Sequence, residues 1–139
     1  MSETSVIDHH TALIYVMVLI SASDGEMTDA ELAQIGNIVT HLPVFRDFDV
    51  ERLSSVAASC NDILQDEDGL DTALALVNAG LPEKLRETAY AMACDVAAAD
   101  GQIKQEELRL LEIMRHELRV GRLPAAAIER GARARHTVL

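Results

Sequence analysis

The sequence Ala-Ser-Asp-Gly-Glu-Met-Thr-Asp-Ala-Glu-Leu occupies residues 22–32, and a similar sequence, Ala-Ala-Asp-Gly-Gln-Ile-Lys-Gln-Glu-Glu-Leu, occupies residues 98–108. Shifting the chain by 76 residues aligns residues 12–39 with 88–115 without a gap. In both places an apolar segment with helical spacing precedes the Asp-Gly pair, and an amphipathic segment follows it. The chain therefore contains a unit of helix, Asp-Gly turn and helix that is used twice.

Apolar residues recur at helical spacing through most of the 139 residues, and no segment alternates strictly enough to be a strand. We therefore predict an all-α fold, a compact single-domain bundle of about 6–8 helices. The two repeat units span about residues 6–42 and 82–119. Connecting helices are expected within residues 49–80, and a basic helix within residues 123–135.

The first helices of the two units, residues 6–22 and 82–99, are expected to pack against each other in the core. The earlier helix is apolar on most sides, which is typical of a central helix. The later helix carries Ala89, Ala93 and Ala97 on one face. Small side chains opposite bulky ones allow two helix axes to approach closely.

Local signals place several helix ends. Thr28 and Glu31 have the spacing of a capping box at the start of a helix. Asp49 is suited to cap the following helix, and residues 65–69 form an acidic turn. Gly80 is expected to end a helix in the left-handed conformation that glycine tolerates best.

Charge is distributed unevenly along the chain. The net charge is −11, which argues against nucleic acid, because a phosphate backbone requires a clustered basic surface. Residues 1–80 carry −12 and residues 81–139 carry +1, with six arginines among the last 25 residues. We expect the basic tail to dock on the acidic half, or on that of a neighbouring molecule, unless it frays. Protein partners or self-association are therefore expected.

Residues 11–23 are uncharged but number only 13, whereas a membrane-spanning helix needs about 20. No transmembrane segment is expected, and residues 1–8 lack the Lys or Arg of an export signal. Cys60 and Cys94 show no CxxC spacing, so neither a disulfide framework nor a thiolate zinc site is indicated. These features favour a cytoplasmic protein.

The two Asp-Gly motifs at residues 22–32 and 98–108, each after an Ala-rich helix, resemble those of the tellurite-resistance TerB-like domains. The resemblance covers most of the chain, because the separation of the motifs matches as well. It implies a compact helical domain built around a pseudo-repeat, non-enzymatic, with paired acidic residues that bind a divalent metal ion. It also implies a link to tellurite resistance and stress response.

The candidate metal ligands are Asp24 and Glu31 in the first unit and Asp100 and Glu107 in the second. The spacing from Asp-Gly to Glu matches the second half of an EF-hand loop, in which Gly allows a sharp turn and Glu ligates from the incoming helix. Apolar residues occupy the positions of the earlier carboxylates. The loops would therefore bind Ca²⁺ or Mg²⁺ only with further ligands, and no organic cofactor is expected.

The same residues also have a purely structural interpretation. A capping box explains Glu31, although Lys104 at the equivalent N-cap position makes capping a weaker explanation for Glu107. The aspartates fit this interpretation less well, because a negative charge at the C-terminal end of a helix is unfavourable. The alternative function is a metal-independent scaffold for protein–protein interaction.

Catalysis has little support, since no nucleophile or phosphate-loop motif is present. No catalytic residue is assigned, and we predict that the protein is not an enzyme. Asp95 lies within an apolar segment and is assigned to a solvated face rather than to an inward position near the site. The histidines form no ligand set. His9 and His10 lie near a terminus that is expected to fray. The other three, His41, His116 and His136, are isolated in the sequence.

Overall fold

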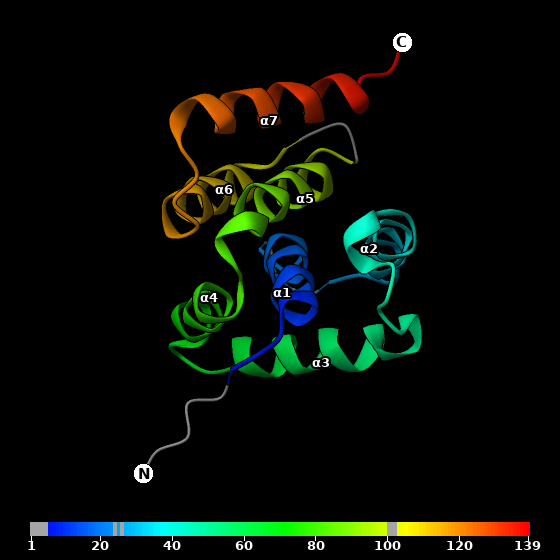
Figure 1. Cartoon of the computed structure of the whole chain (residues 1–139), viewed down its shortest axis with the longest axis vertical. Coiled ribbons are helices and arrows are strands. Elements are labelled where there is room, and N and C mark those ends of the chain that lie inside the picture. The colour runs from blue at the N-terminus through cyan, green and yellow to red at the C-terminus, as the bar shows by residue number, and fades with distance from the viewer. Residues whose placement is uncertain (1–5, 24, 26, 100–102) are drawn as a thin grey trace.

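The helix α1 (His9–Ser21) lies at the centre of the computed structural model, with other helices on every side (Figure 1). Every residue of α1 except His9 and Thr11 is buried. The structure describes residues 6–23, 25, 27–99 and 103–139. The prediction of a buried central helix, made from its uniform apolarity, is confirmed.

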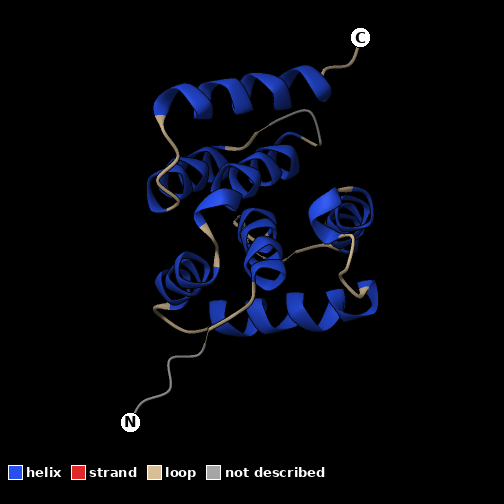
Figure 2. Ribbon diagram, in the orientation of Figure 1, coloured by secondary structure: helices blue, strands red, loops and turns tan. Residues whose placement is uncertain are grey.

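Within the described residues the chain forms only helices and connecting loops (Figure 2). This confirms the all-α prediction. In chain order the elements are α1 (His9–Ser21), α2 (Asp29–His41), η1 (Pro43–Phe45), η2 (Val50–Arg52), α3 (Leu53–Leu64), α4 (Gly69–Gly80), η3 (Glu83–Leu85), α5 (Arg86–Ala98), α6 (Gln105–Glu117) and α7 (Arg122–Arg135), in which η denotes a short 3-10 helix.

Side-chain caps explain several helix starts. α1 begins at His9, later than predicted, because an oxygen of Asp8 accepts a hydrogen bond from the backbone N–H of Thr11 at 2.8 Å. The same hydrogen bond lowers the pKa of Asp8 below its usual value. Asp49 caps the short helix η2 through the N–H of Glu51, at 3.1 Å, and η2 continues directly into α3.

Gly80 ends α4, but the predicted left-handed conformation is wrong, because Gly25 is the residue with positive φ among the described glycines. A Cβ atom on Gly80 would lie 2.4 Å from the backbone oxygen of Ile7. Glycine is needed here because the chain leading into α1 passes close against the end of α4.

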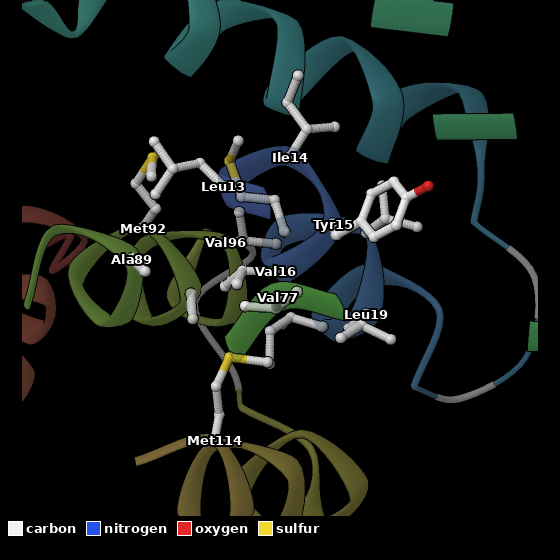
Figure 3. Close-up of a cluster of buried hydrophobic side chains, with 14 of the residues drawn as sticks. Leu13, Ile14, Tyr15, Val16, Leu19, Val77, Ala89, Met92, Val96 and Met114 are labelled. Atoms are coloured by element: carbon white, nitrogen blue, oxygen red, sulfur yellow. The ribbon is translucent and has the colours of Figure 1, made fainter. Parts of the chain in front are cut away.

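The largest interface between two helices joins α1 to α5. Leu13 and Val16 of α1 lie in the same buried cluster as Ala89, Met92 and Val96 of α5 (Figure 3). Ala89 is completely buried, so its methyl group lets the backbone of α5 lie close to α1. The predicted packing of the two first helices is therefore confirmed.

The expectation of a fraying N-terminal segment is wrong at His10, which is 7% exposed. Its Nε2 atom donates a hydrogen bond to the backbone oxygen of Val44 at 2.9 Å. Its ring stacks on Phe45 with centroids 5.5 Å apart and contacts Phe48 at 5.3 Å. These contacts join the first turn of α1 to the loop after α2, an arrangement that neighbouring residues in the sequence do not specify.

The basic helix α7 packs on α5, so the prediction that it docks on the acidic half of its own chain, residues 1–80, is wrong; docking on the acidic half of a neighbouring molecule stays a prediction. Figure 1 shows it on the outer side of α5 and α6. Ala125 and Ala132 are buried in this contact. The hydroxyl group of Tyr90 on α5 donates a hydrogen bond of 2.6 Å to Glu129 on α7. Close packing and a short hydrogen bond therefore hold the helix, in addition to charge.

Candidate functional site

The start of α2 has a complete capping box. An oxygen of Glu31 accepts a hydrogen bond from the backbone N–H of Thr28 at 2.8 Å, and the Thr28 hydroxyl accepts one from the N–H of Glu31 at 3.2 Å. The predicted capping box is confirmed, and Glu31 is half-buried where it makes these bonds. Met27 and Leu32, which have the spacing of a hydrophobic staple around the N-cap Thr28, both pack against the core.

The start of α6 repeats half of this arrangement. Oε1 of Glu107 accepts a hydrogen bond from the backbone N–H of Lys104 at 2.9 Å. The reciprocal bond cannot form, because a lysine side chain has no acceptor atom. Glu107 is 8% exposed, so the second copy buries this residue more deeply than the first copy buries Glu31. Capping therefore explains Glu107 better than the sequence alone indicates.

The two glutamates line a single cavity of about 460 Å³, although 76 residues separate them in sequence. The cavity lies between α2, the end of α5, the start of α6 and the residue after α7. Its lining consists of Thr28, Ala30, Glu31, Gln34, Val96, Ala99, Glu107 and His136. The structure thus brings together the predicted ligands Glu31 and Glu107. Asp24 and Asp100 lie outside the described residues.

His136 follows the C-terminal end of α7 and lines this cavity. In the sequence it is isolated from the other histidines. Its Nε2 atom lies 3.4 Å from a carboxylate oxygen of Asp95 on α5. Arg135 makes an ion pair of 2.6 Å with the same oxygen. Asp95 is therefore not simply a solvated residue: its side chain, 26% exposed, joins α7 to the second repeat unit.

A larger cavity of about 670 Å³ lies on another side of the first Asp-Gly turn. Ser23, Gly25 and Met27 line it together with Asp66 and Glu67 of the acidic turn. Arg109 of α6 also lines this cavity. The acidic turn therefore shares a cavity with Gly25 and Met27, and this cavity is not the one that Glu31 and Glu107 line.

Burial controls the chemistry of both cysteine thiols. Desolvation raises the pKa of Cys60 to about 12 and is the main cause of the same shift, to about 12, in Cys94. Desolvation, and then the hydrogen bond to Glu129, raise the pKa of Tyr90. Since the thiolate is the reactive form of cysteine, both thiols are poor nucleophiles and poor metal ligands at neutral pH.

In the part of the chain that the structure describes, no three His, Cys, Asp or Glu side chains converge closely enough to hold a metal ion. Two of the four predicted ligands, Asp24 and Asp100, lie outside that part. The described contribution to the candidate site is therefore a cavity with two carboxylates and one imidazole on its lining.

These features define an all-helical domain in which two helix-turn-helix units contribute carboxylates to a shared cavity. None of the described helices combines the length and the apolarity that crossing a membrane requires. The family model described as "Tellurite resistance protein TerB" matches residues 10–129. The chain therefore belongs to the TerB family, and the resemblance seen in the two Asp-Gly motifs is confirmed. Among curated proteins and among solved structures, none matches the chain.

Proposed function

We propose that this TerB-family domain is a non-enzymatic module that binds a divalent cation, Ca²⁺ or Mg²⁺, where its two repeat units meet. The observation that carries the proposal is the position of Glu31 and Glu107 on the lining of one cavity. Local structure does not bring together two residues that are 76 positions apart in the sequence. A binding site shared between the two repeat units does require both residues to line the same cavity.

The chemistry of the lining fits a hard cation, because Ca²⁺ and Mg²⁺ prefer carboxylate and other oxygen ligands. Capping engages Oε1 of each glutamate, and a carboxylate has a second oxygen. Asp24 and Asp100, seven residues before each glutamate, would supply further carboxylates. Water must complete the six to eight oxygens that Ca²⁺ takes, so modest affinity is expected.

The family description supports a link to tellurite resistance, and with it to stress response. Binding of tellurite by thiols is not part of the proposal, because Cys60 and Cys94 are buried and unpaired. Free thiols are typical of a reducing compartment, so we place the proposed function in the cytoplasm.

The second candidate is a metal-independent scaffold for protein–protein interaction. The capping hydrogen bonds favour it, since they give Glu31 and Glu107 a structural role without a cation. Under this alternative the carboxylates position α2 and α6, and partners bind elsewhere on the surface.

A metal titration on chelator-stripped protein separates the two candidates. A cation that binds only the folded state raises the melting temperature, and a concentration about a hundredfold above Kd adds about 2.7 kcal/mol of stability. Ca²⁺, Mg²⁺ and Zn²⁺ should be compared. A melting temperature that none of these ions changes would contradict the metal proposal and favour the scaffold.

Substitutions locate the site. Asp24→Asn and Asp100→Asn should reduce the response to the cation and, in chelator, stabilise mildly by removing a charge at a helix end. Glu31→Gln should also reduce the response while keeping a side chain that can close the capping box. Asp29→Asn, an exposed acid in the first turn of the same helix, is the matched control and should respond as the unmodified protein does.

A further inference from the structure

A third cavity, of about 610 Å³, lies between α5, α6 and α7; its lining shares His136 with the proposed cation site but includes neither Glu31 nor Glu107. α7 packs extensively on α5 and α6 packs on it less, while the described residues of α6 and α7 make few contacts with each other. A short linker, residues 118–121, joins the end of α6 to the start of α7. Beyond this linker the two helices border a groove whose base is α5. A cavity of this volume is in the range that holds a single small ligand.

Most of the groove lining is apolar. Cys94 and Ala132 are buried in it, while Ile103 and Leu108 also line it and are 39% and 47% exposed. Val138, after the end of α7, contributes a further apolar side chain. A hydrocarbon chain in the groove would remove these exposed apolar side chains from water, which is favourable.

The charged residues of the lining differ in their exposure. Glu112, Glu129 and Arg133 are exposed to water, whereas Arg115 is half-buried. The guanidinium group of Arg115 makes two long contacts of 3.4 Å, to the backbone oxygen of Val120 and to His116. Among the described residues, no carboxylate lies within salt-bridge distance of it. A half-buried cation without a carboxylate partner favours an anionic ligand.

We propose that the groove between α5, α6 and α7 binds an amphipathic monocarboxylate, with its alkyl chain on the apolar lining and its carboxylate on Arg115. A guanidinium group can bind a carboxylate through two parallel hydrogen bonds, which gives both affinity and orientation. The proposal does not depend on the cation site, because none of these contacts involves Glu31 or Glu107.

Octanoate, 1-octanol and acetate are suitable probes, and binding can be followed by calorimetry and by the methyl NMR signals of Leu108 and Val138. Octanoate should bind and shift both methyl signals. 1-Octanol keeps the chain but lacks the charge, so it should bind about tenfold more weakly, as expected for the loss of hydrogen bonds between charged groups. Acetate lacks the chain and should not bind.

Two variants test the two parts of the site. Arg115→Gln should weaken octanoate binding about tenfold and leave 1-octanol binding unchanged. Leu108→Glu should abolish binding of both. Their controls are Arg109→Gln, on the same helix but facing another cavity, and Leu123→Glu, which is 82% exposed and outside the groove.

Both controls should bind octanoate as the unmodified protein does, and thermal melting verifies that each variant is folded. The proposal is overturned if octanoate does not bind, if 1-octanol binds equally well, or if Arg115→Gln has no effect on octanoate affinity in a folded protein.

Discussion

The two repeat units use the same helix-turn-helix pattern but stabilise it differently. In the first unit a complete capping box between Thr28 and Glu31 fixes the start of α2. In the second unit the side chain of Lys104 cannot accept a hydrogen bond, yet Glu107 is more deeply buried than Glu31. A repeated sequence motif can thus have two local capping hydrogen bonds in one copy and, in the other, one such bond together with deeper burial.

The first helices of the two units, α1 and α5, differ in how they are buried. α1 contacts α2, α3, α4, α5 and α6, and it is buried along nearly its whole length. α5 depends on α7 for the cover of its outer side. Both units therefore need cover from outside the repeat, which α3 and α4 give to the first unit and α7 gives to the second. The following variants test this difference, in order of decreasing change in stability.

Substitutions at aligned core residues should destabilise the protein more in α1 than in α5. Ile20 of α1 is 0% exposed, and its counterpart Val96 of α5 is 7% exposed. Ile20→Ala should cost about 2–5 kcal/mol of stability. Val96→Ala should cost about 0.8 kcal/mol less, because it removes one methylene fewer. Urea unfolding measures both values. An equal or larger loss for Val96→Ala would show that α5 is as central as α1.

Docking of α7 should depend on the hydrogen bond between Tyr90 and Glu129, which is 2.6 Å long. Tyr90→Phe keeps the ring but removes the donor, and we expect a loss of about 1–2 kcal/mol. Hydrogen exchange should then increase in α7 before it increases in α1. Uniform exchange across both helices would contradict the view that α7 covers only the second unit.

Transferring the N-cap of the second unit to the first tests the role of local capping. Thr28→Lys should cost about 0.5–2 kcal/mol, because one of the two capping hydrogen bonds is lost. The reciprocal change, Lys104→Thr, should stabilise by a smaller amount, since existing contacts of Lys104 are lost. Thermal melting compares the pair. If Thr28→Lys does not lower the melting temperature, packing rather than capping stabilises the start of α2, as in the second unit.

The ion pair between Asp95 and Arg135 should have the smallest effect, because both side chains are partly exposed. Asp95→Asn should cost less than about 1 kcal/mol, and high salt should reduce the difference further. Melting at low and high ionic strength measures it. A large cost that salt does not change would indicate that the contact between Asp95 and His136 matters more than the ion pair.

The helix order and the core pairing were predictable because the signals are local or periodic. Uniform apolarity marked α1 as central, and the alanines of α5 marked its partner face. The capping box between Thr28 and Glu31 was predictable for the same reason, since its residues are three apart. The mistaken expectation for Gly80 shows the limit of such signals. Glycine is needed there for a close approach by Ile7, a residue 73 positions earlier.

The candidate site was predictable only in part. The repeat alignment identified Glu31 and Glu107, but their shared cavity depends on how α2, α5 and α6 pack. His136 could not be identified, because it reaches the cavity from the end of α7 and has no counterpart in the repeat. The docking of α7 on α5 was not predicted from the sequence. The net charge of one half of the chain does not show which surface packs against the apolar side chains of α7.

Patterns along the chain specify the all-helical fold, the duplicated unit, the central position of α1 and the family. Helical periodicity and the repeat spacing encode these properties, and both can be read along the chain. The packing of the helices in space establishes the burial of His10, the position of α7, the cavity shared by the two glutamates and the groove beside Arg115. These features depend on contacts between residues distant in sequence, which form wherever shape and polarity match across the packed helices.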